Sequence, residues 1–232
     1  MMSLKNNLFI VSCQALENEP MYGPGVIERM VKSVLLGGAQ GIRISQRENI
    51  EPVLRIVPKD IPVIGITKKM SKDSEVFITP DLDDLKFLIE SKCPIIAIDA
   101  TLRKRPKESL EDLVQYFKKN NHNQLLMADC SSIEDVENAF KLDFDIVSTT
   151  LRGYTKDTLN KPNSYNDFEF LKEVVELNKK YKKYIIAEGG FNTPEMVQKA
   201  YKIGANGVVV GSAITRPTFI TKQFVDYLSN KK

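Results

Sequence analysis

The sequence is poor in the residues that most often bind metal ions or form disulfides. It contains one histidine, His122, and three cysteines, Cys13, Cys93 and Cys130. The cysteines are odd in number and widely separated, so no pair has the spacing of a metal site or a redox motif. We therefore expect buried thiols in a reducing compartment, and no metal site.

Further absences limit where the protein acts and what it binds. The chain has no run of 18 apolar residues, and no long apolar stretch near its start precedes a small-residue cleavage site. These absences predict a cytoplasmic protein that has no membrane partner. The net charge of +3 is too small and too evenly spread to indicate nucleic-acid binding. No linker or low-complexity run interrupts the chain, so we expect residues 1–232 to form a single domain.

The chain does contain a regular alternation of short apolar segments and longer amphipathic ones. Eight such units in 232 residues average about 29 residues, roughly the length of one strand and one helix. Signals for the start of a helix occur at Asp81, Ser109, Ser132, Asp167 and Thr193-Pro194. The predicted strands are 8–14, 40–45, 62–67, 94–101, 123–130, 144–150, 184–190 and 207–212.

Polar residues end five of these strands, although the apolar interior of each strand does not predict them. They are Gln14, Arg43, Lys68, Asp129 and Glu188. Alternate side chains of a barrel strand point inward, so each of the five can face the barrel mouth, where active sites are built. A doubly wound open sheet, the competing architecture, would gather such residues at one switch point. We therefore predict a (β/α)8 TIM barrel with a catalytic cluster at its mouth.

Some of these polar residues also have a purely structural interpretation. Lys68 alone would be expected to be a solvated lysine, and Asp129 could cap the following helix. Asp99, in the fourth strand, is expected to accept hydrogen bonds from its loop. We expect the basic run from Arg103 to Arg105 to form an exposed loop face.

The last two predicted strands both end in small residues. YIIAEGG ends in Gly189-Gly190, and GVVVGSAITRP at positions 207–217 breaks at Gly211-Ser212. In (β/α)8 barrels the loops after strands 7 and 8 often bind a phosphate group through exposed backbone N–H groups. The two endings therefore predict a phosphorylated ligand.

The composition of the predicted site narrows its chemistry. His122 is expected on the opposite, amino-terminal face, so proton transfer falls to Lys68 and the carboxylates. A lysine base needs its pKa lowered by roughly 3 units, and burial together with the positive charge of Arg43 would do so. Desolvation would keep Glu188 protonated when it donates. An acid, a base and a phosphate anchor suit proton removal and return at a carbon beside a carbonyl.

The segments VSCQALENEP, PVIGITKK, IIAIDATLRKRP, LLMADCSS, STTLRGYT, IIAEGGFNTPE and VVVGSAITRP together resemble the N-acetylmannosamine-6-phosphate 2-epimerase family. The resemblance implies a cofactor-independent barrel enzyme that interconverts N-acetylmannosamine 6-phosphate and N-acetylglucosamine 6-phosphate in sialic acid and amino-sugar breakdown. By resemblance, Lys68 and Glu188 are the acid/base pair at C2. The implied substrate-binding residues are Gln14, Arg43, Asp129, Thr150 and Tyr154, and the implied phosphate-binding residues are Gly190, Gly211, Ser212 and Arg216.

The chain departs from the family's pattern at Met70, Ser148 and Gly190-Phe191, and these departures concern loop contacts rather than the acid/base pair. Two alternatives remain open: a lyase that uses Lys68 to form a Schiff base, and a non-catalytic sugar-phosphate sensor. The amphipathic segment 220–230 also predicts a surface for a partner, and we expect a homodimer.

Overall fold

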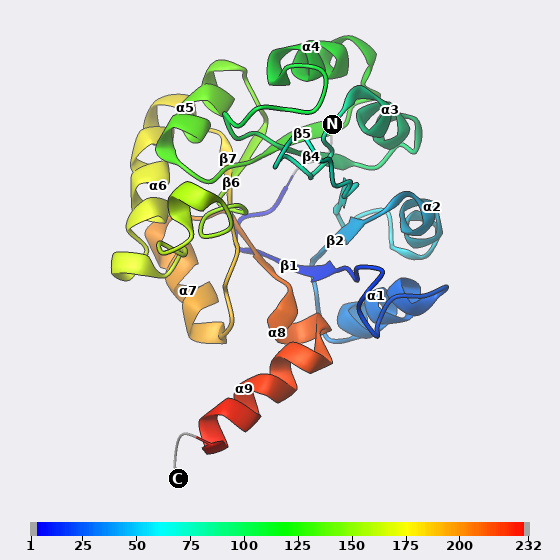
Figure 1. The fold of residues 1–232 in the computed structure, drawn as a ribbon, viewed down its shortest axis with the longest axis vertical. Helices are drawn as coiled ribbons and strands as arrows, with labels where there is room; N and C mark the ends of the chain where they lie inside the picture. Colours follow the sequence, from blue (N-terminus) through cyan, green and yellow to red (C-terminus); the bar gives the residue numbers. More distant parts are fainter. Residues whose placement is uncertain (1–3, 230–232) are drawn as a thin grey trace.

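The eight predicted strands close into one barrel (Figure 1). The structure is a computed structural model that describes residues 4–229. Every strand pairs in parallel with the next in sequence, and the last pairs with the first. The predicted (β/α)8 fold is confirmed, and the open sheet is excluded. The strands are β1 Leu8–Cys13, β2 Gly41–Ser45, β3 Val63–Ile66, β4 Ile95–Asp99, β5 Leu125–Asp129, β6 Ile146–Ser148, β7 Tyr184–Glu188 and β8 Gly207–Val210.

Helices surround the barrel, and the last one leads away from it (Figure 1). Two 3₁₀ turns, η1 Lys156–Thr158 and η2 Tyr165–Asp167, lie in the long connection before α6. No helix among residues 4–229 is long and apolar enough to cross a membrane. The helices are α1 Val26–Leu36, α2 Arg47–Ile56, α3 Leu82–Glu90, α4 Leu110–Asn120, α5 Ile133–Lys141, α6 Glu169–Tyr181, α7 Pro194–Ile203, α8 Ser212–Thr215 and α9 Pro217–Ser229.

Four of the five predicted helix starts are confirmed. The side chains of Asp81, Ser109, Ser132 and Thr193 each accept a hydrogen bond from an amide in the first turn. The prediction at Asp167 is wrong, because α6 begins at Glu169 and has no side-chain cap. Residues 166–168 have left-handed backbone angles, and the Asp167 carboxylate pairs with Lys172 and Lys199 instead.

Two apolar cores hold the barrel in shape. Side chains on the outer faces of the strands pack under the helices. All three cysteines lie in this core, so the prediction that they are buried is confirmed. A smaller core fills the barrel interior with inward-pointing residues such as Ile10, Ile64, Met127 and Ile186. The interior is therefore packed, and polar inward positions are concentrated at the carboxyl ends of the strands.

Candidate active site

A cavity of about 240 Å³ opens at the carboxyl ends of the strands. Its lining includes Ser12, Phe77, Asn192 and Phe219, which are not among the predicted site residues. Asp129 is the one predicted site residue outside the lining, since it lies fully buried behind Arg43. The predicted site residues that line the cavity are Gln14, Arg43, Lys68, Thr150, Tyr154, Glu188, Gly190, Gly211, Ser212 and Arg216.

The guanidinium of Arg43 joins two carboxylates beneath this cavity. Its Nη2 donates to Asp129 Oδ2 at 2.6 Å, and its Nη1 donates to Asp129 Oδ1 at 3.1 Å and to Glu188 Oε2 at 2.7 Å. Burial favours the neutral form of Arg43, but the charges and hydrogen bonds of both carboxylates raise its pKa above the ordinary value. Arg43 therefore stays charged and fixes both acids in place.

Glu188 sits where a carboxyl group holds its proton more strongly than usual. Its pKa is raised to about 7, because burial and the negative charge of Asp129 together outweigh the opposing effect of Arg43. Thr150 Oγ1 lies 3.1 Å from Glu188 Oε2 and 2.7 Å from Asp129 Oδ1, so its hydroxyl bridges the two acids. The expected direction of the Glu188 pKa shift is confirmed.

Lys68 follows β3, and its side chain lines the same cavity as Glu188. Burial lowers its pKa to about 8, and the positive charges of Arg43 and Arg216 contribute to the same shift. Glu188 and Glu19 act in the opposite direction. The predicted effect of burial and Arg43 on this lysine is therefore confirmed. Near neutral pH, a usable fraction of the Lys68 side chain is unprotonated.

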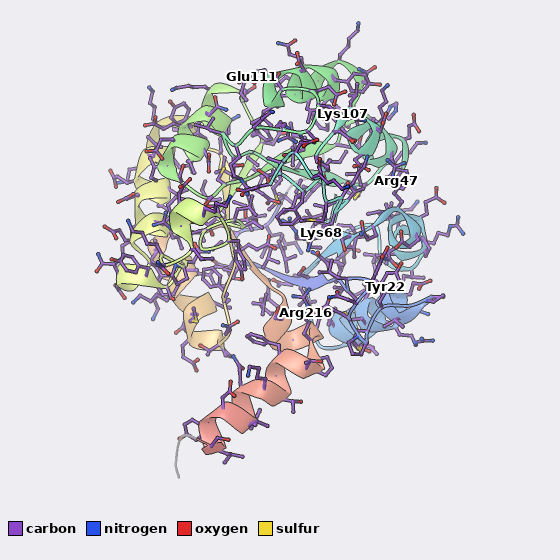
Figure 2. All side chains as sticks on the ribbon, viewed as in Figure 1. Tyr22, Arg47, Lys68, Lys107, Glu111 and Arg216 are labelled. Carbon is purple, nitrogen blue, oxygen red and sulfur yellow. The ribbon has the colours of Figure 1, made fainter. Side chains whose placement is uncertain are left out.

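The loops after β7 and β8 form another wall of the cavity. Gly189 and Gly190 have φ angles of 101° and 75°, which favour glycine. A Cβ on Gly189 would also lie 3.0 Å from the Thr150 carbonyl oxygen, whereas Gly190 faces open space. Arg216 donates from Nη1 to Ser212 Oγ at 3.1 Å. In Figure 2, Arg216 lies beside α8, with Lys68 nearer the centre of the ring of helices.

Two residues that support this wall were missed by sequence reasoning. The fully buried Asn163 directs its Nδ2 at the carbonyl oxygens of Thr149, Glu188 and Gly189. The carboxylate of Glu19, in the β1–α1 loop, lies 2.8 Å from Nε of Arg216. Neither residue lies at a strand end, so the pattern that revealed the other site residues could not find them.

The basic loop after β4 is only partly the exposed face that we expected. Arg105 is buried and donates to the carbonyl oxygens of Asp99, Thr79 and Pro80. The prediction for this residue is therefore wrong, because these loop carbonyls need a buried donor. Arg103 pairs with Asp99, which also accepts from Thr101, so the structural interpretation of Asp99 is confirmed.

The departures from the family's pattern have local explanations. The Ser148 hydroxyl lies 2.7 Å from Thr150 Oγ1 and so supports the residue that bridges the two acids. Phe191 is buried, with its ring centroid 5.7 Å from that of Phe168. Met70 is 80% exposed. Among residues 4–229, no group of three or more His, Cys, Asp or Glu side chains could hold a metal ion.

Fold and site together define a (β/α)8-barrel protein whose cavity, at the carboxyl ends of the strands, is lined by Lys68, Glu188 and the glycine loops after β7 and β8. Residues 27–230 match the family described as "Putative N-acetylmannosamine-6-phosphate epimerase". The chain therefore belongs to the N-acetylmannosamine-6-phosphate epimerase family, and the resemblance of its motifs is confirmed.

Individual relatives cover almost the whole chain. A protein of Mycoplasmopsis pulmonis, described as a 2-epimerase of this family, is 53% identical over 97% of this chain and 99% of its own. A relative in Oceanobacillus iheyensis is 47% identical, over 96% of this chain and 98% of its own. The solved N-acetylmannosamine-6-phosphate 2-epimerase of Clostridium perfringens superposes with a TM-score of 0.88 at 42% identity, and covers 97% of this chain and 94% of that one.

Proposed function

We propose that this protein epimerises C2 of N-acetylmannosamine 6-phosphate to give N-acetylglucosamine 6-phosphate in sialic acid and amino-sugar breakdown. The observation that carries the proposal is the pair Lys68 and Glu188. They lie at the ends of β3 and β7, and both have pKa values displaced toward neutrality in one cavity. Family membership supplies the substrate class, because relatives across the full length are named for this sugar phosphate.

The proposed reaction needs a base on one face of C2 and an acid on the other. Opening of the sugar to its aldehyde makes the C2 hydrogen acidic, so one of Lys68 and Glu188 removes it and the other returns a proton. The pKa of Lys68 is lowered and that of Glu188 is raised, so the two ways of sharing one proton between them lie close in free energy. Catalysis in either direction therefore starts from a well-populated protonation state.

Unpartnered polar atoms mark where the sugar would bind. Gln14 Oε1 and Arg43 Nε are buried beside the cavity and have no hydrogen-bond partner among the described residues. Buried polar groups are normally paired, so we propose that the acetamido and aldehyde groups of the substrate satisfy them. Asp129 acts through Arg43, whereas Thr150 and Tyr154 would contact the sugar from the loop after β6.

The phosphate group would bind between the β7 and β8 loops. Arg216 supplies a guanidinium, Ser212 a hydroxyl, and Gly190 and Gly211 leave the backbone accessible. Anchoring the phosphate away from C2 lets binding energy position the reacting carbon. The Glu19 carboxylate contacts Nε and Nη2 of Arg216 and so orients the guanidinium, whose Nη1 donates to Ser212 Oγ.

We further propose that the chain is one catalytic domain that acts in the cytoplasm as a homodimer. Helix α9 supports the dimer, because none of its residues is buried and its apolar side chains Phe224, Val225 and Leu228 are more than half exposed. A second copy would cover this stripe. Residue 230, the last of the predicted segment, lies outside the described residues. Light scattering should give a dimer for the wild type and a monomer for Phe224→Glu/Leu228→Glu; a wild-type monomer contradicts the proposal.

Proton NMR of N-acetylmannosamine 6-phosphate mixed with the purified protein tests the activity. We expect signals of N-acetylglucosamine 6-phosphate to appear without loss of total sugar phosphate. A lyase that forms a Schiff base at Lys68 would cleave the sugar and leave a reduced lysine adduct after borohydride treatment. A sensor would bind the sugar phosphate and leave it unchanged. Either of these results overturns the proposal.

A further inference from the structure

The main chain of Lys68 lies beyond the last backbone pair between β2 and β3. That register ends at Ser45 and Ile66, after which the β2 chain turns into α2. The Gln46 N–H still donates to the Ile66 carbonyl oxygen at 3.1 Å. Lys68 lies two residues further on, where it forms an antiparallel bridge with Ile78 on its other side. On the β2 side, no backbone group among the described residues pairs with it.

The side chain of Gln46 occupies the missing strand position. Its Oε1 accepts a hydrogen bond from the Lys68 N–H at 3.0 Å, and its Nε2 donates to the Lys68 carbonyl oxygen at 3.3 Å. One amide group therefore satisfies both main-chain polar groups of Lys68, as a neighbouring strand would. The segment that carries Lys68 is held from both sides.

Gln46 makes this contact from an unfavourable backbone conformation. Its φ of 79° and ψ of 141° lie in a region that residues with a side chain rarely adopt. It also occupies the N-cap position of α2, where Ser, Thr, Asp or Asn would normally satisfy an amide of the first turn. Gln46 makes no such bond. Its side chain is directed instead at the residue proposed to react.

We propose that Gln46 is a positioning residue for Lys68. This inference rests on the proposed function and deepens it. By fixing the main chain of Lys68, the Gln46 amide sets the point at which the ammonium group enters the cavity. A displacement of about 1 Å at a reacting group can cost about 100-fold in rate. The substrate is anchored at its phosphate, so loss of the amide should affect turnover more than binding. The charged groups around the ammonium are Arg43, Arg216, Glu188 and Glu19.

The variant Gln46→Gly separates positioning from folding. Glycine removes the amide and tolerates the backbone angles, so the fold should not suffer. The matched control is Asn49→Ala, which removes a hydrogen bond from Asn49 Nδ2 to the Ser45 carbonyl oxygen at the same helix start. We expect Gln46→Gly to lower kcat by about 10- to 100-fold. Its KM should stay within about threefold, and its Tm should be no lower than that of Asn49→Ala.

A second readout follows Lys68 itself. NMR of protein carrying ¹³C-lysine, with the signal assigned from Lys68→Met, gives the pKa of Lys68. In Gln46→Gly this pKa should rise from about 8 toward the ordinary 10.5, because the ammonium moves toward solvent. An unchanged titration, an unchanged kcat in Gln46→Gly, or an equal loss in Asn49→Ala overturns the proposal. If the wild type does not convert the sugar phosphate, the proposed function fails, and the titration alone still decides whether Gln46 positions Lys68.

Discussion

Replacing Lys68 by methionine should abolish activity and yet stabilise the fold at neutral pH. The pKa of Lys68 falls from 10.5 to about 8 on folding, mainly through burial. At 1.36 kcal/mol per pKa unit, holding the charged ammonium there costs about 3 kcal/mol at pH 7. Methionine keeps the apolar stem without the charge. Allowing for partial solvent access, we expect Lys68→Met to raise the free energy of unfolding by about 1–3 kcal/mol.

The extra free energy of unfolding of Lys68→Met, relative to wild type, should only decrease as pH rises. Below pH 8 the folded and unfolded chains both carry the ammonium, so the full cost applies to the wild type. Between pH 8 and 10.5 the folded chain loses its proton first, and the cost disappears as pH rises. Urea denaturation should therefore show the difference between Lys68→Met and wild type falling below about 1 kcal/mol at pH 10.

The same substitution at the exposed Lys59 is the control, and should change stability by less than about 0.5 kcal/mol at either pH. A Lys68→Met variant that is no more stable than wild type at pH 7 would refute the reasoning. A stability gain that stays constant up to pH 10 would show that packing, and not the charge of Lys68, is its cause.

Three further substitutions test other parts of the account. Asp129→Asn removes one of the two carboxylates that neutralise the buried Arg43, so urea denaturation should show a loss of about 3 kcal/mol, and an unchanged stability argues against the pairing. Gly65→Ala would place a Cβ 2.6 Å from Cys93 Sγ. It should cost about 1–3 kcal/mol, and Cys93→Ala should recover part of the lost Tm. Arg216→Met should raise KM by about 10- to 100-fold in steady-state kinetics, with a smaller effect on kcat, and an unchanged KM would remove Arg216 from the phosphate site.

Much of the fold and site could be predicted because both depend on strand periodicity. In a parallel barrel, alternate residues face inward and all strands end at the same rim. For a polar residue near the end of an apolar segment, such as Arg43 or Glu188, the position in the sequence alone therefore predicts a place at the barrel rim. The same logic explains why Ser109 and Thr193 were recognised as caps, since capping is set within one helical turn.

The residues that were missed depend on contacts between distant parts of the chain. Asn163 lies in the long connection before α6, and it donates to carbonyl oxygens at the end of β7 and just after β6 and β7. Arg105 is buried because it meets carbonyl oxygens from a different loop. Asp167 failed as a cap because the backbone before α6 turns left-handed there. Local propensity does not encode these geometries.

Exchange of the C2 hydrogen with solvent tests the central claim most directly. N-acetylmannosamine 6-phosphate in D₂O should gain deuterium at C2 in both epimers when wild-type protein is present, as followed by NMR. Lys68→Met and Glu188→Gln, which remove one proton-transfer group each, should reduce epimerisation by about 100-fold or more. Epimerisation without deuterium incorporation, or full activity in Glu188→Gln, would contradict the two-residue mechanism.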